Sequence, residues 1–400
     1  MAEDQSPPSS QYRERTGTRA GETPNRSRDS QSPHRRQLAS SETQSRQIQV
    51  DATTDDSKPS ADIRRDGKND LRALSWDKGT IIMALRTWLP PDTQAFNVLD
   101  SRGLDTHGLD CLAILVRAIY AARMRQSDLQ TAGSELQPHE KENPLLRLAW
   151  LSFDASFLDI ELESLARYKQ DLLESLCEIP AHLIKPDAVS FLNLVNSDLM
   201  KQTLFAHPNF QLLEAVYSIS PGEIAWTRTE TRDNEVIRWD CREQNCQLQD
   251  CVEKHIRNTQ AAVEGTVSIA QTKPPRFVRV FYTPNQETPL LIDNITKFEI
   301  QVGQWENGHE TRPPAYNASF KCEAYSLVAA VRLESTGRTF IRTFNHRYEM
   351  MNRTTPSAVV DNHWRFGDER TEMHYYLLFA ALPPFEIPKP QTKTRPWGGL

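Results

Sequence analysis

The sequence lacks the features that mark secreted, membrane-spanning and nucleotide-binding proteins. Its N-terminus has no apolar core, so we expect no signal peptide, and no later apolar run approaches the length that spans a membrane. Only 6 cysteines occur in 400 residues, which favours a reducing compartment, the cytoplasm or the nucleus. There is no P-loop, no glycine-rich dinucleotide turn, no His-Glu-x-x-His and no nucleophile elbow. The sequence therefore gives no support for the classes of enzyme that these motifs mark.

Positive charge is also scarce. The chain carries a net charge of -6, which argues against a nucleic-acid partner held by electrostatics. Residues 1–66 contain 11 Lys or Arg and 11 Asp or Glu, so the whole net negative charge belongs to residues 67–400. A mildly acidic body suits a basic protein partner.

Large apolar side chains are almost missing from residues 1–66, and residues 383–400 are proline-rich. Such segments bury too little surface to offset the entropy of ordering, so we predict a disordered tail at each end. The segment between them, 67–382, is predicted to be one domain. It has no internal repeat and no coiled-coil heptads.

The domain is predicted to be α+β, with a helical part over about 95–205 and a β-rich part over about 224–382. Helical periodicity covers residues 111–124, 144–151, 161–177 and 188–205. In the third of these, leucines repeat at near-helical spacing, and Glu163, Lys169 and Glu174 are expected on the opposite, polar face. Strand patterns, expected to form an antiparallel sheet, cover residues 235–239, 277–282, 290–300, 324–333, 339–344 and 375–381.

Cys111 stands where a polar, turn-prone stretch changes into an apolar helical run. Asp110 is a good N-cap, so Cys111 is expected to open the helix. The helix dipole and the free first-turn amides would then favour the thiolate, as in papain-like hydrolases. The alternative is that Cys111 is a small core residue at the start of a buried helix.

Five stretches of the chain resemble segments of the ubiquitin-specific proteases, in the order of that family. Tyr325-x-Leu327-x-Ala329 is similar to the family's Tyr-x-Leu-x-Ala-Val-Val strand. The run from Trp364 resembles its Trp-x-x-Phe-Asp-Asp strand, and the run from Tyr375 resembles its closing Tyr-x-Leu-Phe-Tyr strand. The remaining two are residues 274–280, similar to a Leu-Pro-x-x-Leu strand, and residues 109–120, similar to the nucleophile helix.

The resemblance implies a papain-like hand with a helical thumb, a β palm and a finger extension that holds ubiquitin or a ubiquitin-like modifier. It also implies a Cys–His–Asp/Asn catalytic set for isopeptide hydrolysis. Cys111 would be the nucleophile. The family's oxyanion-stabilising Asn is replaced here by Thr106 or Asp105, and loss of one such donor typically costs about 10²–10³ in rate.

The family's base lies in a Gly-His-Tyr motif, which corresponds here to Gly337-Arg338-Thr339. Neither Arg338 nor Thr339 can act as a general base at neutral pH. His346 is the nearest histidine and becomes the candidate base, whereas His107 is interpreted as a loop residue. Asp368 is the candidate for the residue that orients the imidazole.

A second cluster with chemistry is Cys241-x4-Cys246-x4-Cys251-x3-His255. Three thiolates and one imidazole have the composition of a structural zinc site, and the cluster falls where the family's finger would. The two Cys-x-x-Cys knuckles of the family are missing. Reduced, unligated cysteines are the alternative, and no cofactor is required.

Two functions stay open from the sequence. The first is a cysteine-type deubiquitinase that uses Cys111, His346 and Asp368. The second is a catalytically inactive relative, a pseudoenzyme that binds ubiquitin or acts as an adaptor. A distance discriminates between them, because an active site needs an imidazole within about 3–4 Å of the Cys111 sulfur.

Overall fold

The computed structural model describes most of the body of the chain. The described residues are 69–93, 104–154, 162–212, 216–219, 226–229, 236–242, 247–261, 267–269, 274–285, 295–306, 315–335, 337–345, 351, 359–360 and 373–382. The two predicted tails lie outside these ranges. Within the described residues, no helix is both long enough and apolar enough to span a membrane.

Helices occupy the first half of the described chain, as the apolar periodicity predicts. They are α1 (Lys78–Thr87), α2 (His107–Gln126), α3 (Leu129–Ser134), η1 (Gln137–His139), α4 (Pro144–Leu148), α6 (Leu162–Cys177), η2 (Ala181–Leu183), η3 (Pro186–Val189), α7 (Phe191–Val195), α8 (Asp198–Gln202) and η4 (Pro208–Phe210).

Strands dominate the second half, with one further helix among them. The strands are β1 (Val216–Ile219), β2 (Trp226–Thr229), β3 (Val236–Asp240), β4 (Val267–Ile269), β5 (Phe277–Thr283), β6 (Lys297–Glu306), β7 (Ala315–Glu334), β8 (Thr339–Thr343) and β9 (Met373–Ala381). The helix is α9 (Leu248–Ala261), which lies within the part predicted to be β-rich, between two of the predicted strands.

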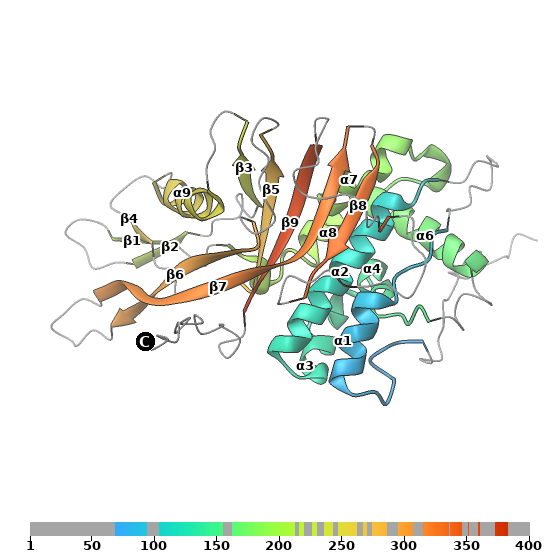
Figure 1. Ribbon diagram of the computed structural model, residues 1–400, viewed down its shortest axis with the longest axis horizontal. Coiled ribbons are helices and arrows are strands. Elements are labelled where there is room, and N and C mark those ends of the chain that lie inside the picture. Colours follow the sequence, from blue (N-terminus) through green and yellow to red (C-terminus); the bar gives the residue numbers. More distant parts are fainter. Residues whose placement is uncertain are drawn as a thin grey trace, which may run out of the picture. The chain divides into compact units, whose positions relative to one another are not determined.

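The main sheet has six strands in the order β3-β5-β9-β7-β6, with β8 also paired to β7 (Figure 1). β7 is long enough to take two partners in succession: residues 315–326 pair with β6 and residues 329–333 pair with β8. A second, three-stranded sheet has the order β2-β1-β4. The expectation of an antiparallel sheet is wrong at one edge, because β3 runs parallel to β5. The fold is therefore a mixed sheet with helices, consistent with the α+β class.

Both faces of the main sheet are buried, which explains why β9 reads as an almost continuous apolar run. Tyr376, Leu378 and Ala380 belong to the core that the sheet shares with helices α1–α8. The alternate residues of β9, such as Leu377 and Phe379, belong to a second core with α9. This period of two is the geometry of a strand whose successive side chains point to opposite faces.

The predicted helix over residues 188–205 is instead three short helices, η3, α7 and α8. Two serines divide it, because each caps the helix that follows. Ser190 accepts a hydrogen bond from the Asn193 amide, and Ser197 accepts one from the Met200 amide. Serine at an N-cap satisfies a first-turn amide that would otherwise have no partner. α7 packs on α2, and the η3–α7 junction lies against Gly108 in the first turn of α2.

Candidate functional site

Helix α2 carries Cys111, but it begins earlier than the sequence pattern predicts. Its N-cap is Thr106 and its first residue is His107, so Asp110 lies inside the helix and is not the cap. The Asp110 amide already donates to the Thr106 carbonyl at 2.8 Å. Cys111 therefore follows the first turn, whose free amides and positive dipole end act mainly on the first few residues.

The environment of the Cys111 thiol opposes ionisation. The side chain is 0% exposed, and its Sγ donates to the carbonyl oxygen of Thr339, 3.7 Å away. Burial raises the pKa of Cys111 well above its ordinary value, and the negative charges of Asp110 and Asp105 raise it further. The expectation of a thiolate-favouring position is wrong, because desolvation of the anion outweighs the helix dipole at this depth.

Two segments pack against α2 at or near Cys111. On one side, the β7–β8 hairpin brings Thr339 against the thiol, and α2 packs on both strands. On the other, the backbone between η3 and α7 lies against α2 one turn before the cysteine. A Cβ at Gly108 would stand 2.2 Å from the carbonyl oxygen of Val189 and 2.7 Å from the amide nitrogen of Phe191. Only glycine permits this approach.

A buried polar network lies beside the thiol. Lys169 of α6 places its Nζ 2.8 Å from Asp110 Oδ1 and donates to the Pro91 carbonyl at 2.9 Å. Burial raises the pKa of Asp110 to about 6, against the opposing attraction of Lys169. The expectation that Lys169 lies on the polar face of its helix is wrong, since its side chain is completely buried.

Thr106, one of the two residues that the resemblance places at the oxyanion position, belongs to the same network. Its Oγ1 lies 2.5 Å from the Thr93 carbonyl oxygen and 2.9 Å from Asp110 Oδ2. The single hydroxyl proton can serve only one of these acceptors, and both belong to the chain itself. Thr106 therefore has no donor left for a substrate carbonyl in this arrangement.

The described histidines do not pair with Cys111. His107 is partly exposed, with its Nδ1 3.3 Å from Asp105 and its Nε2 3.8 Å from Asp92. His374 of β9 has its Nδ1 3.1 Å from the Thr283 hydroxyl. The candidate base His346 and the candidate orienting residue Asp368 both lie outside the described residues.

The candidate zinc ligands are only partly described. Cys241 follows β3 and is buried, Cys251 lies on α9 with its Sγ donating to the Arg238 carbonyl at 3.4 Å, and His255 is one turn further along α9. Cys246 lies outside the described residues. Among the residues that are described, no three His, Cys, Asp or Glu side chains gather in a way that could hold a metal ion. The zinc site stays a prediction.

Comparisons of the chain with protein-family models, with curated proteins and with solved structures find no match. The residues and their contacts therefore carry the functional argument. Sequence reasoning selected Cys111 and Thr106 but missed Lys169 and Gly108. Lys169 had a usable signal, since Leu165, Lys169, Leu172 and Leu176 repeat at helical spacing on one face of α6.

Proposed function

We propose that this chain is a divergent ubiquitin-specific-protease-like domain that no longer hydrolyses isopeptide bonds and acts as a ubiquitin-binding or adaptor module. The burial of Cys111 carries the proposal. Attack on an isopeptide carbonyl requires a thiolate that reaches a substrate atom. A thiol that is 0% exposed and hydrogen-bonded to a main-chain carbonyl does neither.

The neighbours of Cys111 support the relation to the family. In the resemblance, the base follows the strand that corresponds to β7, at Arg338 or Thr339. Cys111 and Thr339 are 228 residues apart in sequence, and yet the thiol contacts the Thr339 carbonyl. A papain-like hand brings together the same two segments, the nucleophile helix and the strand that carries the base. Here Arg338 or Thr339 stands where an imidazole is required.

The competing proposal is an active deubiquitinase. It needs an imidazole within about 3–4 Å of the Cys111 sulfur, and it needs the backbone at residues 189–191 to move away from α2. The contact of the sulfur among the described residues is a carbonyl oxygen, which cannot accept and return a proton as a general base does. The inactive module is therefore favoured.

Charge supports a basic protein as the partner. The net charge of -6 belongs to residues 67–400, and the surface of ubiquitin around its tail is basic. Complementary charge of this kind mainly raises the association rate and improves specificity. We therefore expect binding that weakens as the salt concentration rises.

The test is a ubiquitin probe with a thiol-reactive C-terminal warhead, combined with a direct binding measurement by calorimetry. The full chain is compared with Cys111→Ala and with Cys322→Ser, since Cys322 is an exposed thiol outside the proposed site. A ubiquitin-like modifier serves as the second ligand. The proposal predicts ubiquitin binding without an adduct at Cys111, and the same affinity in Cys111→Ala.

Two results would overturn the proposal in different ways. An adduct that forms with the full chain and is lost only in Cys111→Ala would establish a reactive thiolate and an active hydrolase. Absence of both adduct and binding, for ubiquitin and for the ubiquitin-like modifier, would remove the family resemblance as a guide to function.

A further inference from the structure

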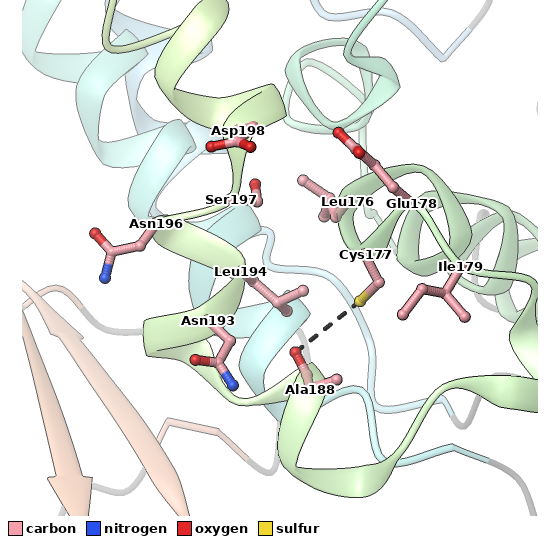
Figure 2. Close-up of a pocket in the computed structure, with 10 residues that line it drawn as sticks. All are labelled: Leu176, Cys177, Glu178, Ile179, Ala188, Asn193, Leu194, Asn196, Ser197 and Asp198. Carbon is pink, nitrogen blue, oxygen red and sulfur yellow. Dashed lines mark hydrogen bonds between the residues drawn. The ribbon is translucent and has the colours of Figure 1, made fainter.

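A surface hollow of about 350 Å³ opens at the carboxyl end of α6. Its walls come from the last turn of α6, from η3 and from the α7–α8 pair, as Figure 2 shows. Its volume falls at the lower end of the range of ligand pockets, about 300–1,000 Å³. It is separate from the Cys111 thiol, which is completely buried.

The floor of the hollow is apolar. Leu176 and Leu194 line it and are themselves almost fully buried. The Cys177 thiol also lines it and donates to the Ala188 carbonyl at 3.9 Å (Figure 2). An aliphatic side chain that entered the hollow would lie against these groups and lose its contact with water.

One exposed aliphatic side chain, Ile179, extends this apolar surface. Four large hydrophobic residues are exposed in the described part of the chain: Met83, Leu162, Ile179 and Leu183. Ile179 lines the hollow, and Leu183, which is 59% exposed, follows it in η2. An exposed aliphatic side chain that lines a hollow is available for contact with a protein partner.

The charge around the hollow is negative. Glu178 and Asp198 line it, and no lysine or arginine does. In Figure 2 the two carboxylates lie at the same end of the hollow. The carboxyl end of α6 adds the negative pole of the helix dipole. Lys201 pairs with Asp198 at 3.3 Å, but both side chains are mostly exposed, and such pairs are weak.

The backbone of Glu178 adopts a conformation that is unfavourable for a residue with a side chain. Glu178 has φ 56°, the left-handed conformation that favours glycine at the end of a helix. A carboxylate next to a helix carboxyl terminus is also electrostatically unfavourable. Glycine would remove both costs.

We propose that this hollow docks a segment of a partner protein in which an aliphatic side chain is followed closely by lysine or arginine. The aliphatic side chain fills the floor between Leu176 and Leu194, and the cation lies between Glu178 and Asp198. The partner makes additional contact with Ile179. The proposal goes beyond the ubiquitin-binding function and does not depend on it.

Selection from a random dodecapeptide library displayed on phage, with the full chain as the target, tests the proposal. The expected result is enrichment of sequences with a Leu, Ile or Met next to a Lys or Arg. A fluorescein-labelled copy of the most enriched peptide is then titrated against the full chain and three variants. We expect Glu178→Lys and Ile179→Ser each to weaken binding at least about tenfold, which corresponds to about 1.4 kcal/mol.

Glu163→Lys is the matched control, because Glu163 is an exposed carboxylate in the first turn of the same helix, far along the chain from the hollow. It should leave the affinity unchanged. Cys177 locates the binding site, since the saturating peptide should slow its alkylation and leave that of Cys322 unaffected. Enriched peptides without basic residues, equal loss in the control, unprotected Cys177, or no enrichment would each overturn the proposal.

Discussion

Lys169 Nζ lies 2.8 Å from Asp110 Oδ1, and neither side chain is more than 2% exposed. The pair joins α6 to α2, and through the Pro91 carbonyl it also holds the segment before α2. Removal of one partner from a buried ion pair leaves an uncompensated charge, which costs more than the pair contributes. This pair therefore determines how the first turns of α2 respond to mutation and to pH.

The first prediction concerns Asp110 and pH. Folding raises the pKa of Asp110 from 3.8 to about 6, so between these values the folded protein binds a proton that the unfolded chain has lost. The stability contributed by this group is fully present below about pH 4 and is lost as the pH rises through 6. The shift corresponds to about 3 kcal/mol. Asp110→Asn should remove that pH dependence.

The measurement is urea unfolding of the full chain and of Asp110→Asn between about pH 2.5 and 8, a window that spans the pKa values of both the folded and the unfolded states. Asp77→Asn is the control, because the pKa of Asp77 shifts in the opposite direction. Hydrogen bonds from Thr80 at the start of α1 lower the pKa of Asp77. Its contribution should be present at neutral pH and lost on acidification. Parallel pH profiles for the full chain and Asp110→Asn would mean that Asp110 stays ionised in the folded protein.

The second prediction concerns Arg117, which is completely buried in α2. Its guanidinium donates to five carbonyls: those of Ala84, Leu85, Trp88, Ala149 and Leu151. Burial lowers its pKa to about 9, so it remains cationic at neutral pH. Arg117→Met should lower the free energy of unfolding by about 3–5 kcal/mol, since buried acceptors lose their donors.

Arg117→Lys separates charge from geometry. Lysine keeps the cation but offers three donors in place of the planar fork of five, so at least two carbonyls lose their partner and much of the stability should still be lost. Arg167→Met, in the exposed pair with Glu163, should change stability by less than about 0.5 kcal/mol. If Arg117→Lys and the unmodified chain had the same free energy of unfolding, the donor geometry of Arg117 would not be what stabilises the fold.

Periodicity predicted much of the fold, and local chemistry explains where it failed. The apolar spacing located α2, α6 and most strands of the main sheet. The division of residues 188–205 depends on Ser190 and Ser197 as N-caps, a signal that the sequence contains. The parallel pairing of β3 with β5 depends on contacts between distant segments, which a strand pattern does not encode.

The candidate site was harder to predict than the fold. Asp110 is a typical N-cap residue, but its carboxylate pairs with Lys169, 59 residues later, and the helix begins at Thr106 instead. The exposure of Cys111 depends on Gly108 and on Thr339, which approach from different parts of the chain. A helix position fixes the direction of the dipole, but only packing decides whether a thiol is desolvated.

The third prediction concerns thiol reactivity at pH 7. Cys322 is exposed, Cys177 and Cys251 are partly buried, and Cys111 and Cys241 are buried. Iodoacetamide followed by mass spectrometry should modify Cys322 first and Cys111 only at the rate at which the protein unfolds, because the thiolate of a buried cysteine is both rare and inaccessible. Fast alkylation of Cys111 in the folded protein would contradict the burial argument and favour the hydrolase.

The fourth prediction concerns Gly108, where the η3–α7 backbone meets α2. A Cβ at this position would lie 2.2 Å from the Val189 carbonyl oxygen, a backbone atom that cannot turn aside as a side chain does. Gly108→Ala should therefore separate the two segments and lower the free energy of unfolding by about 1–3 kcal/mol, the usual range for overpacking. Gly79→Ala, in the exposed first turn of α1, is the matched control: its Cβ would meet only the Asp77 side chain, and alanine should stabilise the helix by up to about 1 kcal/mol.

Thermal unfolding of both variants, together with iodoacetamide labelling of Cys111, tests this prediction. We expect Gly108→Ala to speed the labelling of Cys111, because the displaced segment packs against α2 one turn before the thiol. A stable Gly108→Ala protein with an unreactive Cys111 would mean that η3 and α7 do not determine the burial of the thiol, and that the β7–β8 hairpin alone encloses it.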